Sequence, residues 1–189
     1  MSPSLPLIER APCTPGAPLR VAVLVSGSGS NLQALLDDSR VEGSPYQVCC
    51  VLSNRPAVRV LERASDAGIA HDDDDHRGFP SRGAFEEGML TALGPYAPEI
   101  VVLAGFMRVL TATFVERFSL RIVNVHPALC PAFPGNHAAR QALDAGARVT
   151  GCTVHLVDTG VDTGPILAQA AVPILDDDDE ERLQRRIQV

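Results

Sequence analysis

From Arg20 onward the sequence alternates short apolar runs with stretches of helical periodicity, and this alternation restricts the chain to few folds. Some apolar runs are continuous, as in Val101-Val102-Leu103, where a half-exposed strand would alternate apolar with polar residues. Continuous runs predict strands covered on both faces, and strand–helix alternation predicts a parallel, doubly wound α/β sheet. The length of 189 residues favours a single domain.

Only a loop, Asp158–Pro165, separates the last two predicted strands, so we expect an antiparallel strand pair at the end of the sheet. Residues 1–20 contain five prolines and no periodicity, which predicts a disordered leader before a domain at 21–189. The predicted strands are Val21–Ser26, Gln47–Ser53, Ile69–His71, Glu99–Ala104, Arg121–Val125, Cys152–Val157 and Ile166–Val172. The predicted helices are Asn31–Asp37, Ala57–Ala67, Arg82–Leu93, Ala112–Phe118 and His137–Ala145.

The net charge of −7 is unevenly distributed along the chain. The runs Asp72–Asp75 and Asp176–Glu181 hold ten of the 23 acidic residues, which leaves 13 acidic residues against 16 arginines, or +3. We interpret both runs as solvated loops, because neither has the ligand spacing of a calcium loop. The chain contains no lysine, which excludes Schiff-base enzymes and Walker A ATPases. Low aromatic content and the absence of a basic stripe argue against nucleic-acid binding, and a mildly basic body suits a small anionic substrate.

Cysteine usage and the N-terminal residues predict a cytoplasmic protein. The five cysteines include an adjacent pair and no CxxC spacing, which argues against a disulfide scaffold or a zinc ribbon. The N-terminus has an acidic residue and prolines where a signal peptide needs a basic start and an apolar core. The longest apolar run, Ile100–Met107, is too short to span a bilayer.

The first predicted strand leads through a glycine-rich turn, Ser26–Asn31, directly into a helix. Glycines permit a tight turn, and the helix N-terminus offers unpaired N–H groups to a phosphate. The turn lacks the GxGxxG spacing of dinucleotide folds. Two interpretations remain open: an anion site, or a tight turn in which Ser30 or Asn31 caps the helix.

Asn124 and His126 lie where a predicted strand ends, and ligands of open α/β sheets bind outside such ends. Strand alternation places both side chains on the same side. An amide beside an imidazole suits acyl transfer, with Asn124 stabilising an oxyanion and His126 handling a proton. The alternative is a histidine that binds loop backbone, although the proline-rich loop that follows favours a site.

Asp162, in the turn Gly160–Pro165, is either an Asx-turn residue or a partner of His126. Close to His126, its negative charge would favour the imidazolium form. No HExxH or comparable spacing is present, so we expect no metal site. The other histidines are weaker candidates: His71 and His76 are expected in solvent, His137 at a helix start, and His155 in mid-strand as a core or pocket-wall residue.

Taken in order, the motifs SGSGSNLQ, AGFMR, NVHPxLxPxFPGxH and VDTGPI resemble those of the glycinamide ribonucleotide formyltransferase family of folate-dependent purine enzymes. The resemblance spans essentially everything after residue 20 and implies a Rossmann-like formyltransferase fold. It implies transfer of a formyl group from 10-formyltetrahydrofolate, as co-substrate, to the amino group of glycinamide ribonucleotide, without a metal. The chain ends at Val189, before the C-terminal helical segment that members usually have.

The resemblance also implies roles for particular residues. Asn124, His126 and Asp162 match the catalytic trio, and the loop Asp158–Asp162 would close over the pterin of the folate. The ribonucleotide would bind Gly29, Ser30 and Asn31, with its phosphate on backbone N–H groups. The folate would bind Arg82, Asn124 and the backbone around Met107, Arg108, Val109 and Leu110.

Three questions remain open at this point. A related folate enzyme, formyltetrahydrofolate deformylase or methionyl-tRNA formyltransferase, shares the trio but carries a further domain for which this chain has no room. A non-catalytic binding module on the same fold is the second alternative, although such a module would be expected to lose one of the trio. The sequence also leaves open whether the protein is a monomer or a homodimer.

Overall fold

The computed structural model describes residues 16–27, 29–56 and 59–188. The chain divides into two compact units, one ending at Ile122 and one beginning at Val123. The predicted leader falls outside the described residues as far as residue 15, and the first strand begins at Leu19.

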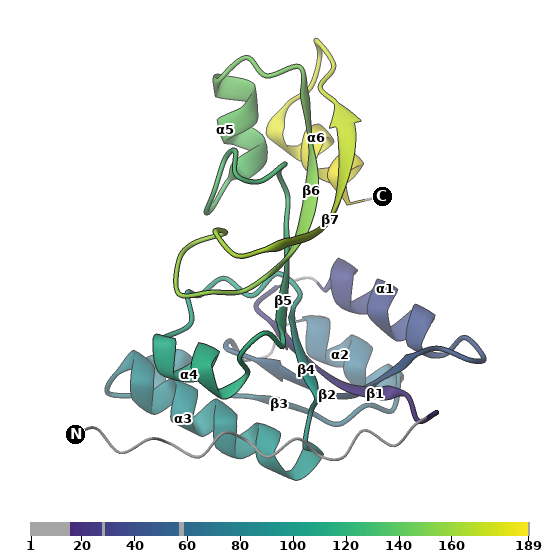
Figure 1. The fold of residues 1–189 in the computed structure, drawn as a ribbon, viewed down its shortest axis with the longest axis vertical. Coiled ribbons are helices and arrows are strands. Elements are labelled where there is room, and N and C mark those ends of the chain that lie inside the picture. The colour runs from purple at the N-terminus through teal and green to yellow at the C-terminus, as the bar shows by residue number, and fades with distance from the viewer. Residues whose placement is uncertain (1–15, 28, 57–58, 189) are drawn as a thin grey trace. The chain divides into compact units, whose positions relative to one another are not determined.

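The first unit alternates strands with helices. Its strands pair in parallel in the order β3-β2-β1-β4. In Figure 1, α1 and α2 lie on one side of these strands and α3 and α4 on the other. The strands are β1 (Leu19–Val25), β2 (Tyr46–Ser53), β3 (His71–Asp73) and β4 (Ile100–Leu103), and the helices are α1 (Ser30–Ser39), α2 (Arg59–Asp66), α3 (Arg82–Leu93) and α4 (Ala112–Arg117), with 3-10 turns η1 (His76–Gly78) and η2 (Gly94–Tyr96).

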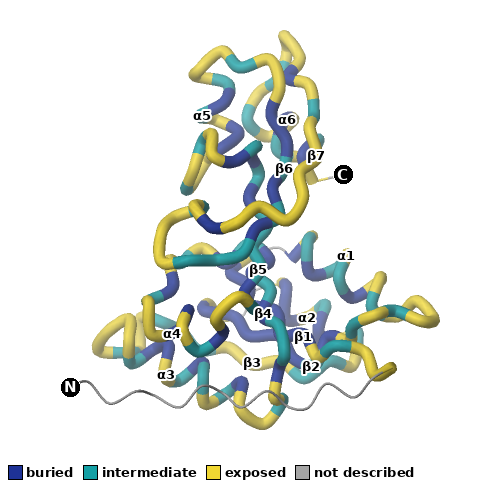
Figure 2. Tube along the Cα trace, viewed as in Figure 1, coloured by how far each residue is buried: buried dark blue, intermediate teal, exposed yellow. Residues whose placement is uncertain are grey.

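β1 is buried on both faces, as its continuous apolar run predicts. Val21, Val23 and Val25 pack against buried residues of α1 and α2. The alternate residues Ala22 and Leu24 face the opposite side of the sheet and are fully buried as well. Figure 2 shows this buried strand among the other buried parts of the unit.

The second unit contains antiparallel strands in the order β5-β6-β7. They are β5 (Ile122–His126, all but its first residue in this unit), β6 (Val149–Leu156) and β7 (Ile166–Pro173). Helices α5 (Ala138–Asp144) and α6 (Glu180–Ile187) share a small core with this sheet. β7 is the edge strand, and nearly all its residues are exposed. The predicted α/β class with an antiparallel end is confirmed, and the antiparallel part includes one more strand than expected.

Helix α6 was not predicted, because the acidic run Asp176–Glu181 is typical of a solvated loop. The side chain of Asp179 caps the helix by accepting a hydrogen bond from the backbone N–H of Arg182 at 2.7 Å. Acidic residues occupy the first turn and arginines the last, which suits the helix dipole. Leu183 and Ile187 lie one turn apart and are buried. The solvated-loop interpretation is also wrong for Asp178, whose side chain is 1% exposed beside Arg186.

Most predicted elements differ from the structure by one to three residues at their ends, and α3 matches at both. The strand predicted at Ile69–His71 is wrong in position, because β3 occupies His71–Asp73. Backbone pairing of Val51 with His71 and of Ser53 with Asp73 holds this short edge strand. Its three residues are polar and exposed, so no apolar run in the sequence marks its position. Part of the helix predicted at Ala57–Ala67 lies outside the described residues, which resume at Arg59. Within the described chain no helix has the length and apolar composition needed to cross a membrane.

Candidate active site

The glycine-rich turn ends in an open helix N-terminus. Gly29 is the N-cap of α1 and has a left-handed backbone with φ +78°. A Cβ atom built on Gly29 would collide with the side chain of Val60, so glycine is required there both for its conformation and for space. No side chain caps α1, so the alternative in which Ser30 or Asn31 caps the helix is wrong. The first N–H groups of α1, including those of Ser30 and Asn31, have no carbonyl partner within the helix, which is the arrangement found at anion sites.

A buried polar pair links two strand ends of the first unit. Ser26, just after β1, donates to Asn54 Oδ1 at 2.5 Å, and Asn54 lies just after β2. The Ser26 hydroxyl also accepts from the backbone N–H of Met107 at 2.8 Å. The segment after β4 is thereby fixed to the end of β1. Sequence reasoning did not single out Ser26 or Asn54 as a pair; the signal was a polar residue directly after each of two apolar strands.

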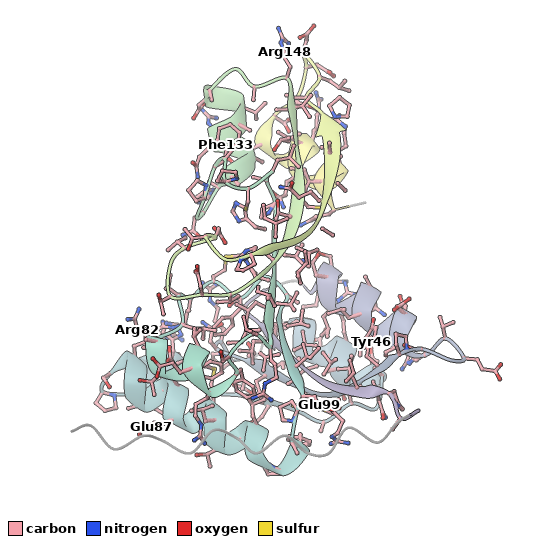
Figure 3. All side chains as sticks on the ribbon, in the orientation of Figure 1. Tyr46, Arg82, Glu87, Glu99, Phe133 and Arg148 are labelled. Atoms are coloured by element: carbon pink, nitrogen blue, oxygen red, sulfur yellow. The ribbon has the colours of Figure 1, made fainter. Side chains whose placement is uncertain are left out.

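The predicted folate segment follows β4. Met107 and Val109 are exposed, whereas Leu110 is buried. The Arg108 guanidinium lies 5.4 Å from the ring centroid of Phe85 in α3, a cation–π distance. Arg82, labelled in Figure 3, projects outward from the start of α3, and its Nη1 lies 3.5 Å from the carbonyl oxygen of Val109, a long hydrogen bond. The structure therefore brings Arg82 close to Val109, and the part of both in folate binding remains a prediction.

The second unit brings Asn124, His126 and Asp162 together. His126 Nδ1 lies 3.2 Å from Asp162 Oδ2, and both side chains are largely buried. Asn124 Nδ2 donates to Asp162 Oδ1 at 3.3 Å. The backbone N–H of Gly135 donates to Asp162 Oδ2 at 2.8 Å. The trio predicted from two separate motifs is thus a single cluster around one carboxylate.

A second histidine shares this carboxylate. His155 in β6 faces Asn124 across the β5–β6 pairing. Its Nε2 lies 3.1 Å from Asn124 Nδ2 and 3.4 Å from Asp162 Oδ1. Sequence analysis placed His155 in a strand as a core or pocket-wall residue but gave it no role. The available signal was its position within a β-strand before the loop that carries Asp162.

The charge of Asp162 is stabilised despite its partial burial. Burial raises the pKa of the Asp162 carboxyl, but hydrogen bonds from His155 and Gly135 and the charge of His126 lower it, and the net pKa is below the usual value. The hydrogen bond with Asp162 raises the pKa of His155, and burial opposes this shift without cancelling it. Asp162 is therefore a carboxylate in the folded protein at neutral pH.

Two residues around His126 have left-handed backbones although neither is glycine. Asp162 has φ +54° and Phe133 also has φ +54°. The carbonyl oxygen of Phe133 lies 2.8 Å from His126 Nε2 and can only accept, so that nitrogen carries the hydrogen. Such conformations cost about 1–3 kcal/mol each and cluster at functional sites. The His126 ring thus lies between Phe133 O on one side and Asp162 on the other.

The loop that follows His126 is anchored to β6 through a buried hydroxyl. Thr153 Oγ1 donates to the carbonyl of Ala128 at 2.6 Å and accepts from the N–H of Cys130 at 2.9 Å. The loop before β7 is closed in a similar way, because Asp158 Oδ1 accepts from Gly160 N at 2.9 Å and from Thr163 Oγ1 at 2.7 Å. Both loops around the cluster are therefore held by their own hydrogen bonds.

Chemically, this cluster can donate hydrogen bonds to a developing oxyanion and can hold an imidazolium ion beside a carboxylate. Within residues 16–27, 29–56 and 59–188, no three His, Cys, Asp or Glu side chains form a group that could hold a metal ion.

Comparison with known proteins places this geometry in a family. A sequence model described as "Formyl transferase" matches residues 19–189. The chain belongs to the formyl transferase family. A phosphoribosylglycinamide formyltransferase of Mycobacterium tuberculosis is 49% identical over 175 residues, which cover 93% of this chain and 80% of that protein. The trifunctional purine biosynthetic protein adenosine-3 of Drosophila melanogaster is 51% identical over 170 residues, which cover 89% of this chain but only 13% of that protein.

Solved structures of formyl transferase family members agree. A glycinamide ribonucleotide transformylase from Symbiobacterium toebii superposes with a TM-score of 0.88 at 48% identity, covering 90% of this chain and 81% of that one. A phosphoribosylglycinamide formyltransferase from Brucella melitensis gives a TM-score of 0.86 at 44% identity, covering 91% and 88%. The predicted family and its fold are confirmed, whereas the roles of individual site residues remain predictions.

Proposed function

We propose that this chain transfers the formyl group of 10-formyltetrahydrofolate to the amino group of glycinamide ribonucleotide, a step of purine biosynthesis. The observation that carries the proposal is the cluster of Asn124, His126 and Asp162 in a formyl transferase fold. The relatives named phosphoribosylglycinamide formyltransferase support the same substrates, because they share 41–49% of their residues with this chain over most of its length.

In the proposed reaction the substrate amine attacks the formyl carbon and gives a tetrahedral intermediate with a negative oxygen. The Asn124 amide and the protonated His126 ring donate hydrogen bonds to that oxygen. Asp162 Oδ2, 3.2 Å from His126 Nδ1, places a negative charge beside the ring. Collapse of the intermediate breaks the bond to N10 of the folate, which takes up a proton as the substrate nitrogen loses one. The products are formylated ribonucleotide and tetrahydrofolate.

The hydrogen on His126 Nε2 is directed to the carbonyl of Phe133. We propose that the formyl oxygen replaces this carbonyl as the acceptor when substrate binds. The left-handed backbone of Phe133 supports this exchange, because a residue held with φ +54° has lower-energy conformations available when its carbonyl turns away.

Substrate binding is assigned by the same proposal. The N–H groups of Gly29, Ser30 and Asn31 would hold the ribonucleotide phosphate, supported by the uncapped start of α1. The segment Met107–Leu110, in which Met107 and Val109 are exposed, would hold the folate together with Arg82, supported by the hydrogen bond that Met107 N donates to Ser26.

The test is a spectrophotometric assay of tetrahydrofolate release with the purified chain, run with and without glycinamide ribonucleotide. Release that depends on the ribonucleotide supports the proposal, whereas release without it identifies a deformylase. Ligand binding without release identifies a non-catalytic module. In a second arm, His126→Ala should abolish transfer and the exposed His71→Gln should leave it unchanged. Equal activity of the His126→Ala variant and the wild type would remove His126 from the mechanism.

A further inference from the structure

His155 is a buried imidazole at the candidate active site that the proposed reaction does not use. Its ring is 3% exposed and lies in β6, opposite Asn124 of β5. Three ionisable groups face it: Asp162 directly, Asp158 from the same loop, and His126 across the Asp162 carboxylate. The neighbouring segment of β7 contributes only uncharged residues, such as Ile166, which pairs with His155.

The protonation of one ring nitrogen is fixed by the backbone. His155 Nδ1 lies 2.9 Å from the carbonyl oxygen of Leu156, which can only accept a hydrogen bond. Nδ1 therefore carries a hydrogen in both the neutral and the charged ring. It follows that Nε2 bears a lone pair when His155 is neutral and a hydrogen when His155 is protonated.

The orientation of the Asn124 amide is fixed by Asp162. A carboxylate oxygen accepts hydrogen bonds only, so the Asn124 atom 3.3 Å from Asp162 Oδ1 is the amide nitrogen. The same nitrogen lies 3.1 Å from His155 Nε2. With His155 neutral, one hydrogen of this amide is donated to Asp162 and the other to His155, so both are engaged.

Protonation of His155 reverses the second of these contacts. Nε2–H then donates to Asp162 Oδ1, 3.4 Å away, and meets the Asn124 amide as donor against donor. Asp162 favours this charged form of the ring, and it raises the pKa of His155. The neutral ring thus accepts a hydrogen bond from the Asn124 amide, whereas the charged ring cannot.

We propose that His155 is a positioning residue that holds the Asn124 amide toward Asp162 while the ring is neutral and releases it when the ring is protonated. The consequence for catalysis rests on the proposed function. An oxyanion that requires an Asn124 N–H competes with His155 Nε2 for that hydrogen. Protonation of His155 removes the competitor, so formyl transfer should be faster when His155 carries a proton.

The first test is independent of activity. NMR titration of the isotope-labelled full chain follows the His155 ring and the Asn124 side-chain amide, with signals assigned from those missing in His155→Gln and Asn124→Ala. The expected result is one shared midpoint for both signals. Different midpoints, an Asn124 amide that does not respond, or a His155 ring that does not titrate between about pH 5 and 9 would each overturn the proposal. The comparison itself uses only wild-type signals, and through-bond correlations from the backbone give their assignment if a variant proves unstable.

The second test uses His155→Gln, whose amide oxygen can accept from Asn124 but does not titrate. The Asn124 signals should then become independent of pH, whereas the control His71→Gln should keep the wild-type titration. In the formyl-transfer assay, kcat of His155→Gln should be about tenfold below wild type near pH 5.5, with KM within about threefold, and the gap should close near pH 9. A gap that is constant across this range indicates a merely structural role and overturns the proposal. A chain without formyl-transfer activity would refute the proposed function, while the NMR titration would still decide the role of His155.

Discussion

Replacing Asp162 by asparagine keeps the shape of the side chain but removes its charge and one acceptor oxygen. Four nitrogen atoms surround the carboxylate: Gly135 N and His126 Nδ1 near Oδ2, and Asn124 Nδ2 and His155 Nε2 near Oδ1. The new amide would direct its oxygen to Gly135, whose N–H cannot accept. Its NH₂ group would then face the Asn124 amide, and that hydrogen bond would be lost.

The expected losses of stability and of activity in Asp162→Asn follow from these contacts. A hydrogen bond to a charged group contributes about 1.5–3 kcal/mol, so losing one should lower the free energy of unfolding at pH 7 by that amount. In the proposed reaction, His126 would lose the negative charge beside it and Asn124 would lose a hydrogen bond that positions its amide. We expect kcat/KM to fall at least about 100-fold, which corresponds to about 2.7 kcal/mol of transition-state stabilisation.

The assay compares urea unfolding and formyl-transfer kinetics of Asp162→Asn with those of Asp144→Asn. Asp144 lies in the same unit, and its carboxylate is 60% exposed in an ion pair with Arg140. Such a surface pair contributes about 0–1 kcal/mol, so the control should remain close to wild type in both measurements. A kcat/KM for Asp162→Asn within about threefold of the control would refute the electrostatic role assigned to this carboxylate.

Four further outcomes follow from the structure. Gly29→Ala should lower the free energy of unfolding by about 1–3 kcal/mol, because φ is +78° and the Cβ meets Val60, whereas Gly27→Ala, with open space around it, should change it little; equal effects in urea titrations would contradict this reasoning. Leu183→Ala should cost about 2–5 kcal/mol if α6 is packed as described, and a loss no larger than that of the exposed Arg185→Ala would argue against that packing. The pKa of Asp162 is lowered on folding, so this carboxylate stabilises the fold above its unfolded pKa near 4. That stabilisation is lost as the pH falls through the folded pKa. The difference in unfolding free energy between wild type and Asp162→Asn should therefore shrink in acid. The pKa of His155 is raised on folding, so its charged ring stabilises the fold fully below the unfolded pKa of about 6.5. That stabilisation is lost as the pH rises through the folded pKa. The difference in unfolding free energy between wild type and His155→Gln should therefore shrink with rising pH, and a difference that grows would contradict this reasoning.

The sequence predicted the elements whose signals are local. Continuous apolar runs identified β1 and β4, and polar residues at strand exits identified Asn124 and His126. Asp162 was proposed as a partner of His126 from its turn and from the family motif, and the structure brings the two within 3.2 Å. A strand buried on both faces and a polar residue at its end are patterns that a single segment carries.

The elements that the sequence missed or misplaced depend on contacts between segments far apart in sequence. β3 consists of acidic and histidine residues and exists because β2 offers it backbone hydrogen bonds. The pair Ser26–Asn54 joins residues 28 positions apart, and His155 acquires its neighbours only when β6 pairs with β5. The sequence of α6 is mostly charged, so its helix was not predicted. The two buried residues of α6 pack against α5 and the sheet. Such pairings cannot be read from one segment alone.

The exposed edge strand β7 has a consequence for handling the protein. Residues Ile166–Pro173 include no charged side chain, and Ile166 and Leu167 are about half exposed. An edge without lysine, without a charge and with proline only at its last residue leaves backbone donors and acceptors open to a strand of another chain. Concentrated samples of the protein should therefore tend to associate through β7 edges. A single lysine in place of Ala168 or Ala170 would be the smallest change that opposes this association.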